Sequence, residues 1–119
     1  MQVKSERMKH AVLSALADPE MSSILRAVMH SPKSATEIVR EGNISQTTCY
    51  RKIKWLLDEG LLVTDRIELT PEGKKYSVFK GVLKSINVTF EFESDIYVNC
   101  EWIANNADDT AERVFFSDH

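Results

Sequence analysis

The chain has 119 residues, of which 43% are hydrophobic and 28% are charged, and its formal net charge is −3 at pH 7. This length predicts one domain with one core, and the ordinary composition excludes a disordered chain. No apolar run approaches the roughly 18 residues that a membrane-spanning helix needs, and no signal-like stretch follows the polar start. We therefore expect a cytoplasmic protein without membrane contact.

The charge is distributed unevenly along the chain. Residues 1–90 hold 14 Lys and Arg against 10 Asp and Glu, whereas residues 91–119 hold one Arg against eight acidic residues. The attraction of a polyanion depends on where charges lie as well as on their sum. The acidic end therefore does not exclude nucleic-acid binding by the basic part.

Cysteine and histidine spacing argues against a metal site. Cys49 and Cys100 form no CxxC pair, and the three histidines stand far apart. Structural zinc sites bring their ligands in closely spaced pairs. The chain also has no glycine-rich phosphate loop and no nucleophile motif. We expect no metal, no cofactor and no enzymatic activity.

The first quarter of the chain is predicted to form two helices. Apolar residues at helical spacing indicate a helix over about residues 5–16. Asp18 and Pro19 then begin a second helix, because Asp is a favoured N-cap and Pro is favoured at the first helical position. The apolar side of the second helix holds Met21, Ile24, Leu25 and Val28.

Two further helices are separated by a short turn. Ser34 and Glu37 have the spacing of a capping box, in which each side chain satisfies a backbone N–H at a helix start. Gly42-Asn43 tolerates the left-handed backbone that ends a helix. Ser45 is the next N-cap, and the apolar residues after it predict a helix over 46–59 with one buried stripe. The stripe consists of Cys49, Ile53, Leu56 and Leu57.

After Gly60 the apolar period changes to that of strands. Residues 61–69 and 76–79 are predicted to form a hairpin, or wing, around the turn at 70–73. A competing interpretation begins a helix at Thr70, with Pro71 at its first position. The pattern alone leaves open whether residues 70–83 are strand or helix.

A second hairpin is predicted towards the C-terminus. Apolar and polar residues alternate over 86–92 and again over 96–102. A two-stranded hairpin is marginal alone, so its apolar face must pack on the preceding domain or on another subunit. We expect a winged helix DNA-binding domain over 1–83, a β-hairpin over 84–104 for dimerisation or packing, and a polar tail over 105–119. The fold class is then α+β, a winged helix-turn-helix with an additional C-terminal β-hairpin.

The order of capping box, Gly-Asn turn, Ser cap, basic helix and hairpin is typical of a winged helix-turn-helix. The second helix of that motif enters the major groove of double-stranded DNA. There Gln pairs with adenine, Thr contacts the thymine methyl group and Arg pairs with guanine, while Lys and Tyr suit phosphates. The candidate DNA-binding residues are Ser45, Gln46, Thr47, Thr48, Tyr50, Arg51, Lys52 and Lys54 on the helix, with Arg66, Lys74 and Lys75 on the wing.

The chain resembles the winged-helix transcriptional regulators of the ArsR-like group, in their small prokaryotic and archaeal form, over roughly residues 8–80. The matching residues are Ser34-Ala35-Thr36-Glu37-Ile38, Ile44-Ser45-Gln46-Thr47-Thr48-Cys49-Tyr50-Arg51-Lys52-Ile53, Leu56 and Glu59-Gly60-Leu61-Leu62-Val63. The resemblance implies a homodimer bound to an operator, with Gln46, Thr47, Thr48, Tyr50 and Arg51 in the DNA-reading positions.

The chain departs from two patterns of this group. The helix before the turn lacks the Cys-x-Cys of the metal-sensing members, so the resemblance implies no metal effector. The hairpin over 84–103 also differs from the terminal helix through which many members dimerise. The effector and the dimer geometry stay open at this point.

Two other functions are compatible with the pattern. A winged helix also serves as a protein docking module without direct DNA binding, because fold alone does not settle function. A docking face would more often be apolar, whereas Arg51, Lys52 and Lys54 make this one basic. A small-molecule or redox sensor with DNA as its output would need a pocket between the C-terminal hairpin and the helices.

Overall fold

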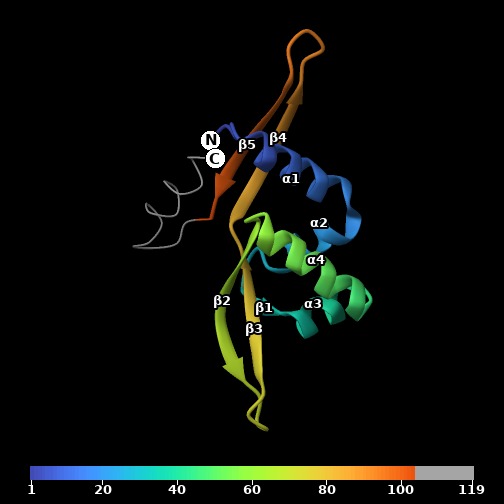
Figure 1. Ribbon diagram of the computed structural model, residues 1–119, viewed down its shortest axis with the longest axis vertical. Helices are drawn as coiled ribbons and strands as arrows, with labels where there is room; N and C mark the ends of the chain where they lie inside the picture. The colour runs from blue at the N-terminus through green and yellow to red at the C-terminus, as the bar shows by residue number, and fades with distance from the viewer. Residues whose placement is uncertain (104–119) are drawn as a thin grey trace.

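The computed structural model describes residues 1–103, and the tail predicted over 105–119 lies outside them. The helices are α1 (Glu6–Ala17), α2 (Pro19–Ala27), α3 (Ala35–Gly42) and α4 (Gln46–Asp58). The strands are β1 (Lys33–Ser34), β2 (Leu62–Leu69), β3 (Lys75–Gly81), β4 (Leu83–Phe90) and β5 (Ile96–Trp102). In Figure 1 the helices lie to one side, while the β2–β3 and β4–β5 hairpins extend in opposite directions. The α+β fold is that of a winged helix with an added C-terminal hairpin.

Helices α2, α3 and α4 begin at the side chains that the sequence predicts as caps. Asp18 accepts hydrogen bonds from the backbone N–H groups of Glu20 and Met21 at 2.9 and 3.0 Å. Ser34 and Glu37 form the complete capping box at the start of α3. Helix α3 ends at Asn43, whose φ of 52° is left-handed. Side-chain capping therefore defines the helix-turn-helix, because each cap satisfies a backbone group that the helix leaves unpaired.

The wing is a strand hairpin, so the alternative helix over 70–83 is wrong. Strand β3 pairs antiparallel with both β1 and β2, which gives the order β1-β3-β2. The turn is closed by backbone hydrogen bonds from Thr70 N–H to the Lys74 carbonyl and from Gly73 N–H to the Thr70 carbonyl. Gly73 has a φ of +85°, which a residue with a Cβ rarely adopts. Sheet pairing on both sides of β3 overrides the local helix signal at Thr70 and Pro71.

One hydrophobic core joins the helices to both hairpins. It contains Val12, Ile24, Ile38 and Leu56 from the four helices, Leu62 and Phe79 from the wing, and Val98 and Cys100 from β5. The start of the chain runs along the outer edge of β5, where Val3 N–H donates to the Val98 carbonyl at 2.7 Å. The base of the β4–β5 hairpin is therefore packed onto the winged helix.

The length and composition of the helices bear on membrane insertion. Over residues 1–103, none of them combines the length and the apolar character that spanning a bilayer requires.

Candidate nucleic-acid interface

Helix α4 presents one buried face and one exposed face. Of the predicted stripe, Cys49, Ile53 and Leu56 are at most 2% exposed, whereas Leu57 is half-buried. On the opposite side Gln46, Thr47, Tyr50, Arg51 and Lys54 are exposed to solvent. Ser45 caps the helix by accepting a hydrogen bond from the Thr48 backbone N–H at 3.3 Å. The exposed face therefore carries amide, hydroxyl, phenol, guanidinium and ammonium groups.

The wing brings further cations beside this face. Lys74 and Lys75 are exposed at the turn end of the β2–β3 hairpin. Arg66, near the bulge that follows Thr64, is half exposed. Of the eleven predicted residues, nine are exposed and Thr48 is half-buried, and only Lys52 is buried. The fold thus gathers ten of them at the surface of α4 and the wing.

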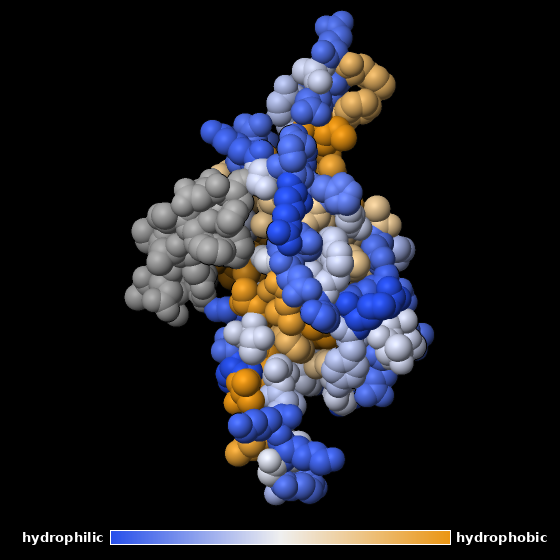
Figure 2. Space-filling view, in the orientation of Figure 1, coloured by the Kyte–Doolittle hydropathy of each residue, from blue (hydrophilic) through white to orange (hydrophobic). Residues whose placement is uncertain are grey.

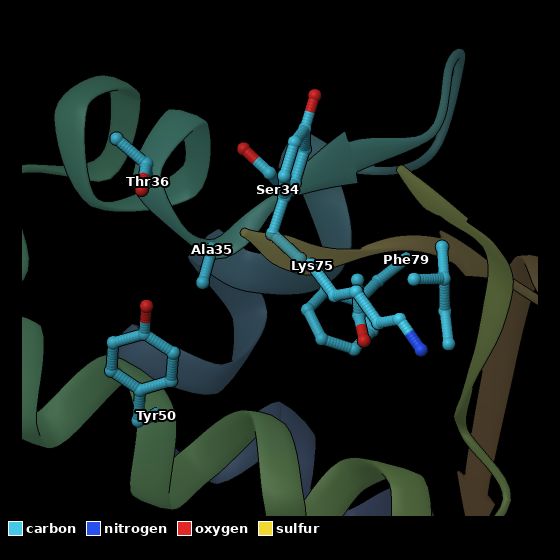
Figure 3. Close-up of a pocket in the computed structure, with 9 residues that line it drawn as sticks. Ser34, Ala35, Thr36, Tyr50, Lys75 and Phe79 are labelled. Atoms are coloured by element: carbon cyan, nitrogen blue, oxygen red, sulfur yellow. The ribbon is translucent and has the colours of Figure 1, made fainter. Parts of the chain in front are cut away.

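A hollow of about 320 Å³ separates α4 from the wing. The start of α3 closes its third side, and Figure 3 shows Tyr50 reaching from α4 towards Ala35 and Thr36, with Lys75 on the wing side. Tyr76 also lines this hollow. The phenol of Tyr50 and the ammonium of Lys75 therefore border one concave surface that runs from α4 to the wing.

Sequence reasoning missed Thr36 and Tyr76 as members of this surface. The capping box places Thr36 in the first turn of α3, where it is exposed. Its place at a helix start beside the turn was therefore predictable from the sequence. Tyr76 donates a hydrogen bond to the Glu68 carboxylate at 2.7 Å, and this bond raises the pKa of the Tyr76 phenol. No local sequence pattern indicates that Tyr76 belongs to this surface, because the hollow forms only when β3 meets α3, α4 and β2.

Lys52 does not lie on the exposed face of α4, so its prediction as a phosphate contact needs correction. Its side chain is 10% exposed, and its ammonium donates to Asp18 and lies 3.2 Å from a Glu20 carboxylate oxygen. The hydrogen bond from Lys52 lowers the pKa of the Asp18 carboxyl, and the same bond raises the pKa of Lys52. Lys52 therefore links the middle of α4 to the start of α2.

Arg66 and Lys54 reach the surface with acidic neighbours of their own. Arg66 pairs with Glu68 and Asp65, and the hydrogen bond to Glu68 is the main reason that its pKa is raised. Lys54 lies 3.3 Å from Asp58, one helical turn away. Exposed pairs of this kind are weak, so both side chains can exchange these partners for phosphate.

The described residues offer no evident metal centre. Over residues 1–103, no three His, Cys, Asp or Glu side chains gather as a metal ion requires. Cys49 and Cys100 are buried free thiols, and burial raises the pKa of each. Both cysteines therefore belong to the apolar core.

The fold and this surface define a winged helix-turn-helix domain in which the exposed face of α4 is polar and cationic. The family model for bacterial regulatory proteins of the arsR family matches residues 18–64, from the start of α2 into β2. Residues 18–64 therefore form an ArsR-like helix-turn-helix domain, and this domain supports a DNA-binding transcription regulator. The comparison with curated proteins found no match.

Proposed function

We propose that the protein is a homodimeric, sequence-specific regulator that inserts the N-terminal half of α4 into the major groove, with the wing on the flanking backbone. The observation that carries this proposal is the continuous exposed surface from Gln46, Thr47 and Arg51 of α4 across the Tyr50 hollow to Lys75 of the wing. Groove readers need hydrogen-bonding groups near the helix start and cations around them.

The exposed residues of α4 have distinct proposed roles. Gln46 and Thr47 lie in the first turn, where they suit adenine and the thymine methyl group, and Arg51 one turn later suits guanine. Ser45 and Thr48 lie at the helix start, whose unpaired N–H groups favour a phosphate. Tyr50 and Lys54 flank the reading residues and suit the phosphates on either side.

The wing supplies contacts that are independent of sequence. Lys74 and Lys75 are proposed to meet flanking phosphates, and Arg66 is proposed to meet a phosphate or the minor groove. The acidic tip of the other hairpin, with Glu91, Glu93 and Asp95, lies at the opposite end of the molecule from the wing (Figure 1). The acidic cluster at this tip is therefore kept away from the proposed DNA surface.

The exposed face of α4 also separates this proposal from a docking module. Arg51 and Lys54 are exposed there, whereas the apolar residues of the helix point into the core. A protein-docking face would instead expose apolar residues and few charges, since the centres of protein interfaces are depleted in charged residues. A homodimer would present two reading helices about one helical turn apart and would favour a nearly palindromic site.

The test compares single alanine variants on specific and random duplexes at two salt concentrations. Arg51→Ala is expected to weaken specific binding by about 1–3 kcal/mol and random binding less, because it removes a base contact. Lys75→Ala should weaken both equally and flatten the salt dependence. Lys4→Ala is the matched control, because Lys4 is exposed beside the N-terminal segment that pairs with β5 and is not part of the proposed DNA surface. Equal losses on both duplexes for Arg51→Ala would remove Arg51 from base reading.

A further inference from the structure

The apolar face of the β4–β5 hairpin is covered at its base and bare near its tip. Val98 and Cys100 on this face are at most 2% exposed, whereas Val88, Phe90 and Phe92 are 43%, 59% and 92% exposed. The rings of Phe90 and Phe92 lie 4.7 Å apart, so they form one patch. Figure 2 shows hydrophobic side chains on the projecting hairpin beside hydrophilic ones at its end. The turn between β4 and β5 contains the exposed residues Glu91 and Glu93.

The same hairpin has one open edge. The start of the chain covers the outer edge of β5, but β4 pairs only with β5 among the described residues. The Glu91 N–H donates to the Asp95 carbonyl, so odd-numbered residues of the outer hairpin bond across to β5. Hydrogen bonding alternates along an antiparallel ladder, so Ile86, Val88 and Phe90 turn their N–H and C=O groups to the open edge. An open edge of this kind is a template for another strand.

A groove of about 250 Å³ lies beside the base of β4, between that strand and helices α1 and α2. Its lining includes the apolar side chains of Leu16, Leu25 and Met29, and Leu16 is 45% exposed. Arg26 and Lys84 add two positive charges to the lining. The groove is therefore apolar and cationic, whereas the hairpin tip is apolar and anionic.

We infer that the occupant of this edge and groove is a second copy of the chain. Strand β4 would pair antiparallel with β4 of the second copy about a two-fold axis at Val88, which places Ile86 opposite Phe90 of the other chain. In this register the open backbone groups of Ile86, Val88 and Phe90 bond to one another, and opposite residues share the apolar face. Each tip then reaches the groove of the other chain, with Phe92 opposite Lys84.

The charges agree with this arrangement. The acidic tip of each chain, which carries Glu91 and Glu93, would lie beside the basic groove of the other chain, which carries Arg26 and Lys84. A two-fold axis makes this attraction twice. This interface locates the dimer contact of the proposed regulator. It rests on the proposed function only in assuming a homodimer, because none of the proposed DNA-contacting residues takes part in it.

The first test measures the oligomeric state by sedimentation equilibrium without DNA. The wild-type protein is expected to be dimeric, and Phe90→Ser with Phe92→Ser is expected to weaken the dimer at least tenfold, because the variant removes the inserted patch. Leu69→Ser is the matched control, since Leu69 is equally apolar and is 63% exposed on the wing. A monomeric wild type, or a Phe variant that dimerises like the control, would overturn the inference.

A charge exchange tests the pairing of tip and groove. Arg26→Glu with Lys84→Glu should give a monomer, because acidic residues then face acidic residues, and Glu91→Lys with Glu93→Lys should give a monomer for the opposite reason. An equimolar mixture of the two variants should restore the dimer, since every contact in the mixed pair joins opposite charges. Two monomeric variants that do not associate on mixing would contradict the proposed contact.

A cysteine scan tests the register. Val88→Cys should form an intersubunit disulfide under mild oxidation, because directly opposite residues of a hydrogen-bonded pair have Cα atoms about 5.5 Å apart, within disulfide range. Glu93→Cys, at the tip and far from the axis, should not. Cross-linking of Glu93→Cys but not Val88→Cys would overturn the register.

The outcome for this interface can be separated from the outcome for DNA binding. A Phe90 and Phe92 variant that stays dimeric and still binds DNA would overturn this interface and leave the proposed function standing. A charge-dependent dimer without DNA binding would support the interface while the proposed function fails.

Discussion

The contact of Lys52 with Asp18 yields the sharpest prediction about how the reading helix is held. Asp18 caps α2 through the N–H groups of Glu20 and Met21 and also accepts from the Lys52 ammonium. The Lys52 side chain is 10% exposed and that of Asp18 is 26% exposed, so solvent screens this pair less than a surface pair. Removing Asp18 should therefore cost both a cap and a partly buried charge partner.

The two contributions can be separated by choice of variant. Asp18→Ala should lower the free energy of unfolding by about 2–3 kcal/mol, of which about 1 is the cap and about 1–2 is the charged hydrogen bond. Asp18→Asn keeps a good cap and should lose only about 1–2 kcal/mol. Urea unfolding at a fixed protein concentration measures both, because a dimer makes stability depend on concentration.

The pH dependence follows from the same pair. The pKa of Asp18 is lowered in the folded state, so its contribution is present above the ordinary aspartate pKa of about 3.9 and is lost as pH falls through the lowered value. The pKa of Lys52 is raised, so its contribution is complete below about pH 10 and is lost as pH rises through the raised value. Asp18→Asn should therefore remove part of the acid sensitivity of the wild type.

One comparison would refute this account of Lys52. We expect Lys52→Met to be less stable, by about 1–2 kcal/mol, with the salt dependence of DNA binding unchanged. An unchanged stability together with a salt slope reduced by about one would show instead that Lys52 contacts a phosphate.

Two further predictions concern the capping box and the cysteines. Ser34→Ala should cost about 1 kcal/mol in urea unfolding, because the Glu37 N–H loses the Ser34 hydroxyl as its acceptor, and Ser34→Thr should recover most of the loss; equal stability of the two variants would contradict the cap. Cys49 and Cys100 should react with a thiol reagent at neutral pH only at the rate of unfolding, since both are buried and their pKa values are raised, and fast modification of the native protein would contradict their burial.

The sequence predicted the helix starts well because caps are local. Asp18, Ser34 and Ser45 each satisfy backbone groups within three residues of themselves, so a short window holds the whole signal. The choice between strand and helix after Thr70 was open for the opposite reason. It depends on the pairing of β3 with β1, some forty residues earlier, which no local window contains.

In the candidate site too, some positions follow from local spacing and others depend on contacts distant in the sequence. The buried stripe of α4 follows from helical spacing, and the exposed residues opposite it follow from the stripe. Lys52 was predicted at the surface because a charged residue beside an apolar stripe is ordinarily exposed. Its acidic partner Asp18 lies 34 residues earlier, at the start of α2, so the local sequence does not show the ion pair that lets Lys52 be buried. Tyr76 joins the surface through the fold of the wing, so its position required the structure.

The central claim is that the exposed face of α4 reads DNA, and one titration tests it most directly. The purified protein is titrated with fluorescent duplexes, one from its own upstream region and one random, at low and at physiological salt. We expect salt-sensitive binding that prefers the upstream duplex, and loss of that preference in Arg51→Ala. No binding to either duplex at low salt would contradict the account and favour a protein-docking module.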